Sequence, residues 1–294
     1  MKWFEICDPL MRQALEYYAS TGRRVPRPPQ EEDCPGYLQW ERYLGIDLSL
    51  YAFLREFEVE AAGRRESTFN AAAAASAFAG ARLSQLIDLN IHIRSPERVG
   101  TRLSSMDITM MPFNALGVFI GDARALPLAR LLIAAARRGW FQLDERYPIY
   151  IFMLLLLARF LEEPLPVALI ASLRNTLWGN LLDCWDHPQA QSIAAMCAAA
   201  CDVHTTRCNV RKDLDFSSGS WCYIPIELML LMRLRAMRGL GQPQFDHPLW
   251  LPAFCCEPIA MKLPGDIVDA VEQRMAGDGF DEAWITDHVL EGEQ

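Results

Sequence analysis

The sequence predicts an all-α fold, an irregular multi-helix bundle built from antiparallel helical hairpins. No segment alternates apolar and polar residues for long, and no Asn-Gly or Asp-Gly turn joins two β-branched runs. The helix-favouring residues Ala, Leu, Met, Arg and Glu dominate, and apolar residues recur at three- and four-residue spacing. Successive helices with short connections are typical of hairpins packed into one bundle.

The first helix is expected to begin at Asp8, which can cap it, with Pro9 in its first turn, and to end at Gly22. Residues 23–36 contain four prolines and predict a loop. Two long helices are predicted at 37–62 and 67–93. The second contains the run Ala71–Ala75, whose small side chains allow a close approach between helices.

Further helices are predicted along the remaining chain, where glycines and prolines separate the apolar patterns. Their ranges are 113–120, 125–138, 148–161, 166–185, 189–204, 224–238, 249–261, 266–275 and 281–290. The most apolar run, 149–158, is too short as a helix to cross a hydrocarbon layer of about 30 Å, so it predicts a buried core helix. We expect a single all-helical domain over 1–294, with lobes at 1–110 and 111–294 as an open alternative.

The net charge of −9 lies entirely in the last fifth of the chain. From residue 239 onward there are eleven acidic residues and only two basic ones, Lys262 and Arg274, whereas the preceding residues are balanced. This excess of one sign argues against nucleic-acid binding, which needs positive charge, and favours a basic protein partner. The segment therefore predicts a partner-binding surface.

Within this segment, acids recur at helical spacing and are interleaved with aromatic residues. Such a combination suits binding to a basic groove, since an aromatic anchor supplies affinity and charge speeds association. The predicted partner-binding residues are Asp266, Asp269, Glu272, Asp278, Phe280, Asp281, Glu282, Trp284 and Asp287. Reversing Asp269, Glu272, Asp281 and Glu282 to Lys is expected to slow association and leave the fold intact.

The sharpest alternative is a metal-containing helical enzyme that uses Cys197, Cys201, His204 and Cys208. On one continuous helix these residues span about 16 Å along the axis, so a metal site requires the helix to break near residues 202–206. Burial of these residues as a core stripe is the preferred interpretation. No nucleophile elbow or phosphate-binding loop occurs, so we predict neither catalysis nor a cofactor. A non-catalytic adaptor or scaffold is the other alternative.

The cysteine usage and the N-terminal sequence bear on location. Nine cysteines in a chain of this length favour reduced thiols, and residues 1–8 lack a continuous apolar run and a cleavage site. Both observations predict a cytoplasmic protein with no membrane partner.

Three stretches resemble a known family. They are Ala115-Leu116-Gly117 through Gly139-Trp140, the core segment Tyr147–Leu161, and Leu249-Trp250-Leu251-Pro252-Ala253-Phe254 ahead of the acidic end. In these the chain resembles the TsiT-like immunity proteins that bacteria pair with nuclease effectors of type VI secretion. The resemblance implies stoichiometric binding that blocks a cognate toxin, without turnover or cofactor. The stretches are apolar helix patterns, so no functional residue is carried over.

Overall fold

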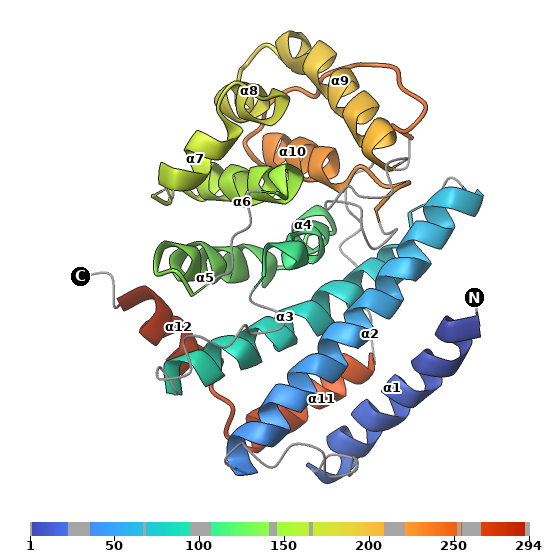
Figure 1. Cartoon of the computed structure of the whole chain (residues 1–294), viewed down its shortest axis with the longest axis vertical. Helices are drawn as coiled ribbons and strands as arrows, with labels where there is room; N and C mark the ends of the chain where they lie inside the picture. Colours follow the sequence, from blue (N-terminus) through green and yellow to red (C-terminus); the bar gives the residue numbers. More distant parts are fainter. Residues whose placement is uncertain are drawn as a thin grey trace.

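The computed structural model describes residues 2–22, 36–66, 69–94, 107–140, 146–164, 167–208, 221–251, 254 and 266–291. These residues form helices and contain no β-strand, which confirms the predicted all-α multi-helix bundle (Figure 1). The helices are α1 (Lys2–Thr21), α2 (Gly36–Glu66), α3 (Ala71–Arg94), the 3-10 helix η2 (Ile108–Met110), α4 (Met111–Phe119), α5 (Ala125–Arg137), α6 (Pro148–Leu161), α7 (Val167–Leu173), α8 (Leu177–Cys184), α9 (Gln191–Cys208), α10 (Ile226–Met237), α11 (Ile267–Gly277) and α12 (Glu282–Glu291).

The bundle is organised around two long antiparallel helices, α2 and α3, which pack along much of their length (Figure 1). Helix α1 lies against α2, and α4 joins α3 to α6 and α10 on the other side. Helices α7, α8 and α9 extend the bundle beyond α6. The two C-terminal helices return to the beginning of the chain: α11 contacts α1 and α3, and α12 contacts α3 and α5.

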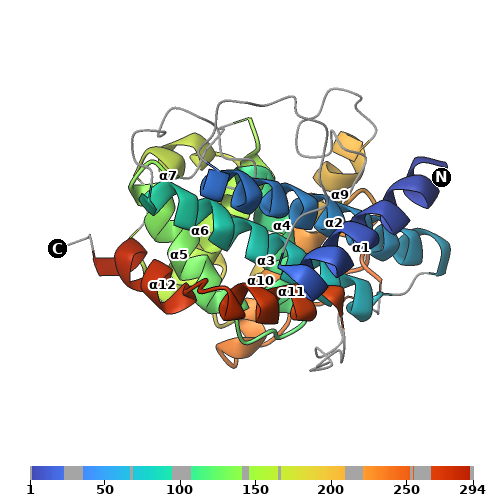
Figure 2. The same cartoon turned by 90° about the horizontal axis from the view of Figure 1, so that it is seen from below.

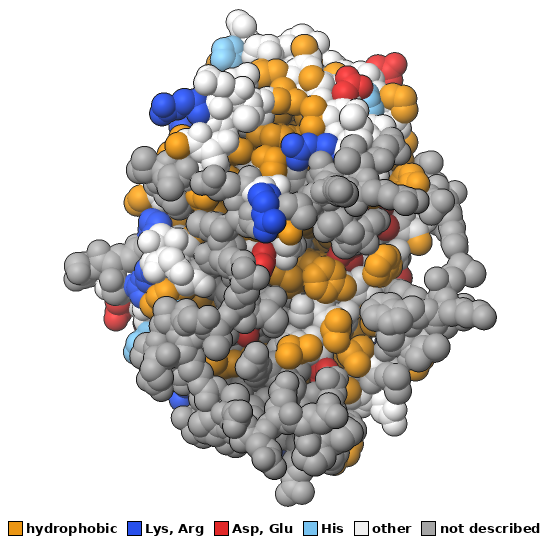
Figure 3. Space-filling view, in the orientation of Figure 1, with side chains coloured by type: hydrophobic (Ala, Val, Ile, Leu, Met, Phe, Trp, Pro, Cys, Tyr) orange, Lys and Arg blue, Asp and Glu red, His pale blue; other side chains and the backbone are white. Residues whose placement is uncertain are grey.

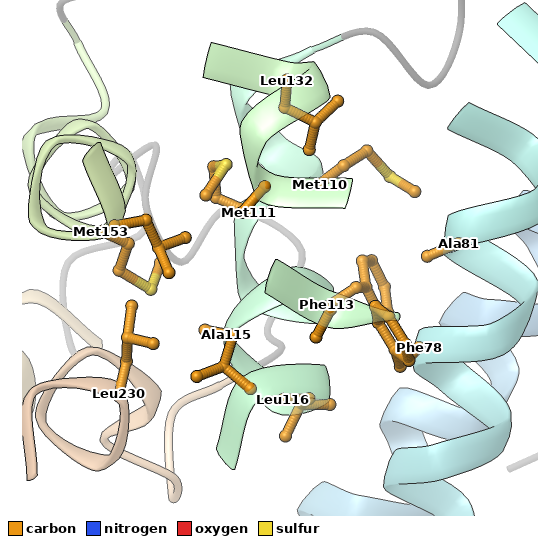
Figure 4. Packing of buried hydrophobic residues seen from close by; sticks show 14 of the residues in the cluster. Phe78, Ala81, Met110, Met111, Phe113, Ala115, Leu116, Leu132, Met153 and Leu230 are labelled. Atoms are coloured by element: carbon orange, nitrogen blue, oxygen red, sulfur yellow. The ribbon is translucent and has the colours of Figure 1, made fainter. Parts of the chain in front are cut away.

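Helix α4 lies at the centre of the hydrophobic core. All nine of its residues are buried, because α3, α5, α6 and α10 pack around it. Figure 4 shows Phe113 of α4 beside Phe78 of α3, while Met111 and Ala115 point toward Met153 and Leu230. A helix whose residues are apolar except for Asn114 is expected at such a position, since it has no face to turn toward water.

Gly117 of α4 permits a close approach to α3. A Cβ atom at this position would lie 2.5–2.7 Å from ring carbons of the fully buried Phe78. We expect Gly117→Ala to lower the free energy of unfolding by about 1–2 kcal/mol, since overpacking outweighs the better helix propensity of Ala. Urea denaturation measures the change. Gly277→Ala is the control, because a Cβ there meets no atom within 4 Å; equal effects of the two substitutions would contradict the packing argument.

The run Ala71–Ala75 was predicted to allow close helix approach, and α3 does approach α2 closely. The Ser84 hydroxyl donates to the Gly45 carbonyl oxygen at 2.7 Å, and a Cβ atom at Gly80 would lie 3.0 Å from the Leu48 carbonyl oxygen. Ala73, Ala74 and Ala77 are buried. Contact through small side chains therefore brings the two backbones together along much of the pair.

Two predicted helix boundaries are wrong. Helix α1 begins at Lys2 and runs through Pro9, so Asp8 does not cap it; the helix continues past Pro9 although this residue has no N–H to donate. The single helix predicted over 166–185 is two helices, because Asn175 adopts a left-handed conformation (φ 61°) and Thr176 caps α8 by accepting from Gly179 N at 3.1 Å. The predicted end at Gly22 is confirmed by its φ of 65° and a bond from its N–H to the Tyr18 carbonyl.

Other predicted features fall partly outside the described residues. Residues 249–251 are not helical, and most of the predicted helix 249–261 lies outside the described residues, as does the loop 23–35. One buried cluster contains residues on both sides of the suggested lobe boundary at 110 and 111, and the division into lobes remains a prediction. Of the helices that the structure describes, none combines the length and apolarity needed to cross a membrane.

Candidate partner-binding surface

The predicted surface corresponds to α11, α12 and the turn between them. The two helices lie in a row along one side of the molecule (Figure 2). Asp266 caps α11 by accepting from Val268 N at 3.3 Å, and Asp281 accepts from Trp284 N at 2.9 Å at the start of α12. Carboxylates are favoured at helix N-termini because they satisfy unpaired N–H groups. Two of the predicted binding residues thus have a local structural role.

The apolar sides of both helices are buried in the bundle. Val268, Val271 and Met275 of α11 and Ile285 and Val289 of α12 are each at most 1% exposed. Their burial fixes the rotation of the two helices about their axes. It therefore decides which of the acids face the neighbouring helices and which face water.

The acids next to this apolar side bind a buried arginine of α3. Arg82 is 2% exposed; it donates from Nη1 to Glu272 Oε1 at 2.8 Å and from Nη2 to Glu282 Oε2. A buried guanidinium is stable only when carboxylates compensate its charge. Glu272 and Glu282 are thus both engaged within the chain, one from each C-terminal helix.

A second arginine extends this charged cluster. Arg124 donates from Nη1 to Glu272 Oε2 at 3.0 Å and makes three hydrogen bonds to Asp122, through its backbone N–H, Nε and Nη2. Burial alone would raise the pKa of Asp122, but the bonds from Arg124 outweigh it and lower the pKa. The pKa of the nearby Asp269 is raised, by burial first, although Arg124 opposes the shift.

The two predicted aromatic anchors also face the body of the protein. Phe280 is half-buried and packs against the core. The ring of Trp284 lies 4.1 Å from the His288 ring and 4.7 Å from the Arg94 guanidinium, measured to the ring centroid. Asp266 likewise accepts from the Tyr51 hydroxyl at 3.0 Å. Contacts within the chain thus account for much of the predicted set.

Acids on the outer side of the two helices remain exposed. Asp281 is exposed apart from its capping bond, and Asp278 receives Arg274 Nε at 3.0 Å. The side chain of Asp287 is exposed and makes no hydrogen bond or ion pair with another described residue, and Glu291 is exposed one turn later. By contrast, acidic side chains are only scattered among the described residues on the face in Figure 3. The outer side of α12 is therefore the part of the predicted surface that is free to meet a partner.

Sequence reasoning missed the arginines on the inner side. Arg82 stands among small and apolar residues of α3, in the run Ala77-Phe78-Ala79-Gly80-Ala81-Arg82-Leu83. A single charge in such a buried pattern requires a carboxylate partner from elsewhere in the chain. That signal points to an internal ion pair, although it does not say which acid supplies it.

Comparisons with protein-family models, curated proteins and solved structures found no match to this chain.

The alternative site on α9 does not have the geometry of a metal centre. Helix α9 continues without a break through Cys208, so the break required near residues 202–206 is absent. His204 uses both ring nitrogens: Nδ1 lies 2.8 Å from Glu227 Oε1, and Nε2 lies 2.7 Å from the Trp221 carbonyl oxygen. Within the described ranges, no three His, Cys, Asp or Glu side chains meet as ligands would.

The cysteines of the middle of α9 belong to the core. Cys197 and Cys201 are fully buried, and burial raises the pKa of Cys197 to about 12 and that of Cys201 further. A thiol that stays protonated is a poor nucleophile at neutral pH. The preferred interpretation of a buried stripe therefore fits these two residues.

A buried carboxylate, Glu60 of α2, lies near the same cluster and accepts from Tyr223 N at 3.2 Å. Burial raises its pKa from 4.5 to about 7, against the opposing effect of the Tyr223 bond. Because the folded-state pKa is the higher one, the folded protein binds more protons than the unfolded chain between these values. The contribution of Glu60 to stability is then greatest below about pH 4.5 and falls as pH rises to about 7.

We expect Glu60→Gln to remove this loss, since the amide oxygen can still accept from Tyr223 N. At about pH 8 the variant should be more stable than the wild type by up to about 3 kcal/mol, and at about pH 4 the two should be alike. Urea denaturation across this pH range measures the difference. Glu16→Gln, at an exposed position, is the control; a pH-independent effect of Glu60→Gln would contradict the titration argument.

Proposed function

We propose that this chain is a non-catalytic immunity protein that acts in the cytoplasm and inhibits a cognate toxin. The proposed toxin is a nuclease with a cationic substrate cleft. The observation that carries the proposal is the exposed acidic side of α12 and of the turn before it. Asp278, Asp281, Asp287 and Glu291 lie there, whereas the inner acids pair with arginines of the body. The surface turned to solvent at this end therefore stays negative.

The physical mechanism is occlusion. A cleft that binds nucleic acid carries positive charge, and a negative surface accelerates encounter with it and competes with the substrate. Stoichiometric binding is enough for inhibition, so the inhibitor needs no turnover and no cofactor. The rigid packing of α11 and α12 on α1, α3 and α5 supports the proposal, since a surface held in place loses little entropy on binding.

The test uses the protein encoded by the neighbouring gene as the partner. Asp287→Lys/Glu291→Lys, at two exposed acids of α12, should slow association roughly tenfold or more at low salt and much less at high salt. Glu16→Lys/Asp246→Lys, at two exposed acids outside α11 and α12, is the charge-matched control and should change the rate little. Equal association rates for the double variant and the wild type would remove α12 from the interface.

Growth separates an inhibitor from an adaptor. If the neighbouring protein is toxic when expressed alone, co-expression of the wild-type chain should restore growth, and the double variant should restore it less. Binding without rescue would instead favour a non-catalytic adaptor that uses the same surface.

A further inference from the structure

Two cysteines that lie on either side of the connection from α9 to α10 are brought together. Cys208 is the last residue of α9, and Cys222 lies four residues ahead of α10. Both are half-buried, and Cys208 Sγ lies 3.7 Å from the Cys222 carbonyl oxygen. The two thiols are close enough to shift each other's pKa in opposite directions. This contact makes the two cysteines neighbours in the fold, as a disulfide between them requires.

The charges around the pair activate one thiol in particular. The hydrogen bond from Cys208, opposed by burial and assisted by the nearby His204, lowers the pKa of Cys222 to about 7. The same hydrogen bond, together with burial, raises the pKa of Cys208. One attacking thiolate beside a protonated partner is the arrangement found in redox-active dithiols. Cys197 and Cys201 are fully buried, and burial raises the pKa of both thiols, so neither supplies an accessible thiolate.

We propose that Cys208 and Cys222 form a redox-active pair, which low-molecular-weight disulfides such as oxidised glutathione convert to an intramolecular disulfide. This site is separate from α12, so the inference does not depend on the proposed function.

The exchange has two steps. The Cys222 thiolate attacks one sulfur of oxidised glutathione, which forms a mixed disulfide and releases one glutathione thiolate. Cys208 then loses its proton to the solvent, and its thiolate attacks the Cys222 sulfur. The bond from Cys222 to glutathione breaks, and a second glutathione thiolate leaves. The protein loses two electrons and two protons, and one glutathione disulfide is reduced to two glutathione thiols.

The bond would join the end of α9 to the segment ahead of α10. It closes a loop of about 15 residues, a length at which a cross-link stabilises mainly by restricting the unfolded chain. We expect the oxidised protein to melt about 5 °C or more above the reduced one. Dithiothreitol should reverse the shift.

The experiment treats the full-length protein with oxidised glutathione near neutral pH, blocks remaining thiols with iodoacetamide, and maps peptides by mass spectrometry. The expected product is a cross-link between the peptides containing Cys208 and Cys222, with the loss of two hydrogen atoms from the intact mass. Cys208→Ser should stop at the mixed disulfide on Cys222, and Cys197→Ser should cross-link as the wild type does. A folded wild type without this cross-link overturns the proposal.

The pH profile of alkylation tests whether Cys208 activates Cys222. In the wild type the rate at Cys222 should rise through about pH 7, whereas in Cys208→Ser the midpoint should move upward. Cys208→Ala is the second variant, because a Ser hydroxyl at 208 can still donate a hydrogen bond to Cys222 whereas Ala has no donor. If the midpoint stays unchanged in Cys208→Ala, the hydrogen bond does not activate Cys222 and the proposed order of attack is wrong.

Discussion

Replacing Glu272 and Glu282 together by Gln is expected to lower the free energy of unfolding by about 3 kcal/mol. The double substitution removes both carboxylates that pair with the guanidinium of Arg82, which is 2% exposed. Breaking a buried pair by removing one sign is costly because an uncompensated charge stays buried. Urea denaturation at neutral pH measures the difference.

Replacing the arginine instead of the two glutamates should lower the free energy of unfolding much less. Arg82→Met removes the buried charge, and the two carboxylates that remain are 31% and 43% exposed and therefore reach water. We expect a loss below about 1 kcal/mol. Asp281→Asn/Asp287→Asn, at exposed positions, should change stability by at most about 0.5 kcal/mol. If Arg82→Met costs as much as the double Gln variant, the account of a compensated buried charge is wrong.

The ion pairs of Arg82 with Glu272 and Glu282 restrict which acids can be replaced in a test of partner binding. Reversal of Asp269, Glu272, Asp281 and Glu282 together was expected to leave the fold intact. Two of these four carboxylates hold Arg82, so Lys at both positions would place two further positive charges beside it. Loss of binding in that variant would report unfolding rather than the interface, which is why the exposed Asp287 and Glu291 are the better pair.

The second large effect is expected at the buried pair of His204 and Glu227. The two side chains are 0% and 1% exposed, and Nδ1 lies 2.8 Å from the carboxylate. His204→Leu leaves the Glu227 carboxylate buried without its partner, and we expect a loss of about 3–5 kcal/mol at about pH 8. Glu227→Gln should cost only about 1 kcal/mol, because a neutral His204 can still donate from Nε2 to the Trp221 carbonyl.

The pH dependence that His204 gives to stability should differ in sign between the wild type and Glu227→Gln. Burial alone would lower the pKa of His204, but Glu227, through its charge and its hydrogen bond, and the Trp221 carbonyl outweigh it and raise the pKa. The contribution of this histidine to stability is then present below about pH 6.5 and is lost as pH rises through the raised value. In Glu227→Gln burial dominates, so stability should instead rise with pH across this range.

The two pH profiles are best compared in a Glu60→Gln background, since Glu60 titrates in the same range. Unfolding free energies at about pH 6 and about pH 8 are sufficient to obtain the sign. Profiles of the same sign with and without Glu227 would show that this carboxylate does not hold the proton on His204.

Local sequence signals predicted most of the helices. The range 148–161 matches α6, and Gly22 ends α1 as expected, because a proline at N1 and a glycine in the left-handed region act within one turn. Two local signals were interpreted wrongly. Pro9 lies inside α1 rather than at its start, and Asn175 with Thr176 divides the predicted helix 166–185.

The acidic pattern was predicted as a helical stripe, and the structure contains that stripe. Asp266, Asp269 and Glu272 lie on one side of α11, as their spacing indicates. The stripe faces Tyr51 and Arg124, so part of it meets the chain itself. Periodicity says which residues share a face, but it does not say what that face meets.

The sequence alone determined the all-α class, the course of most helices and the position of the excess negative charge along the chain, because each depends on residues within a few turns of one another. Only the tertiary structure decided how that charge is used. Arg82 meets Glu272 and Glu282 across 190 and 200 residues of chain. Such a pairing arises from the packing of α11 and α12 against α3, and no local pattern encodes it.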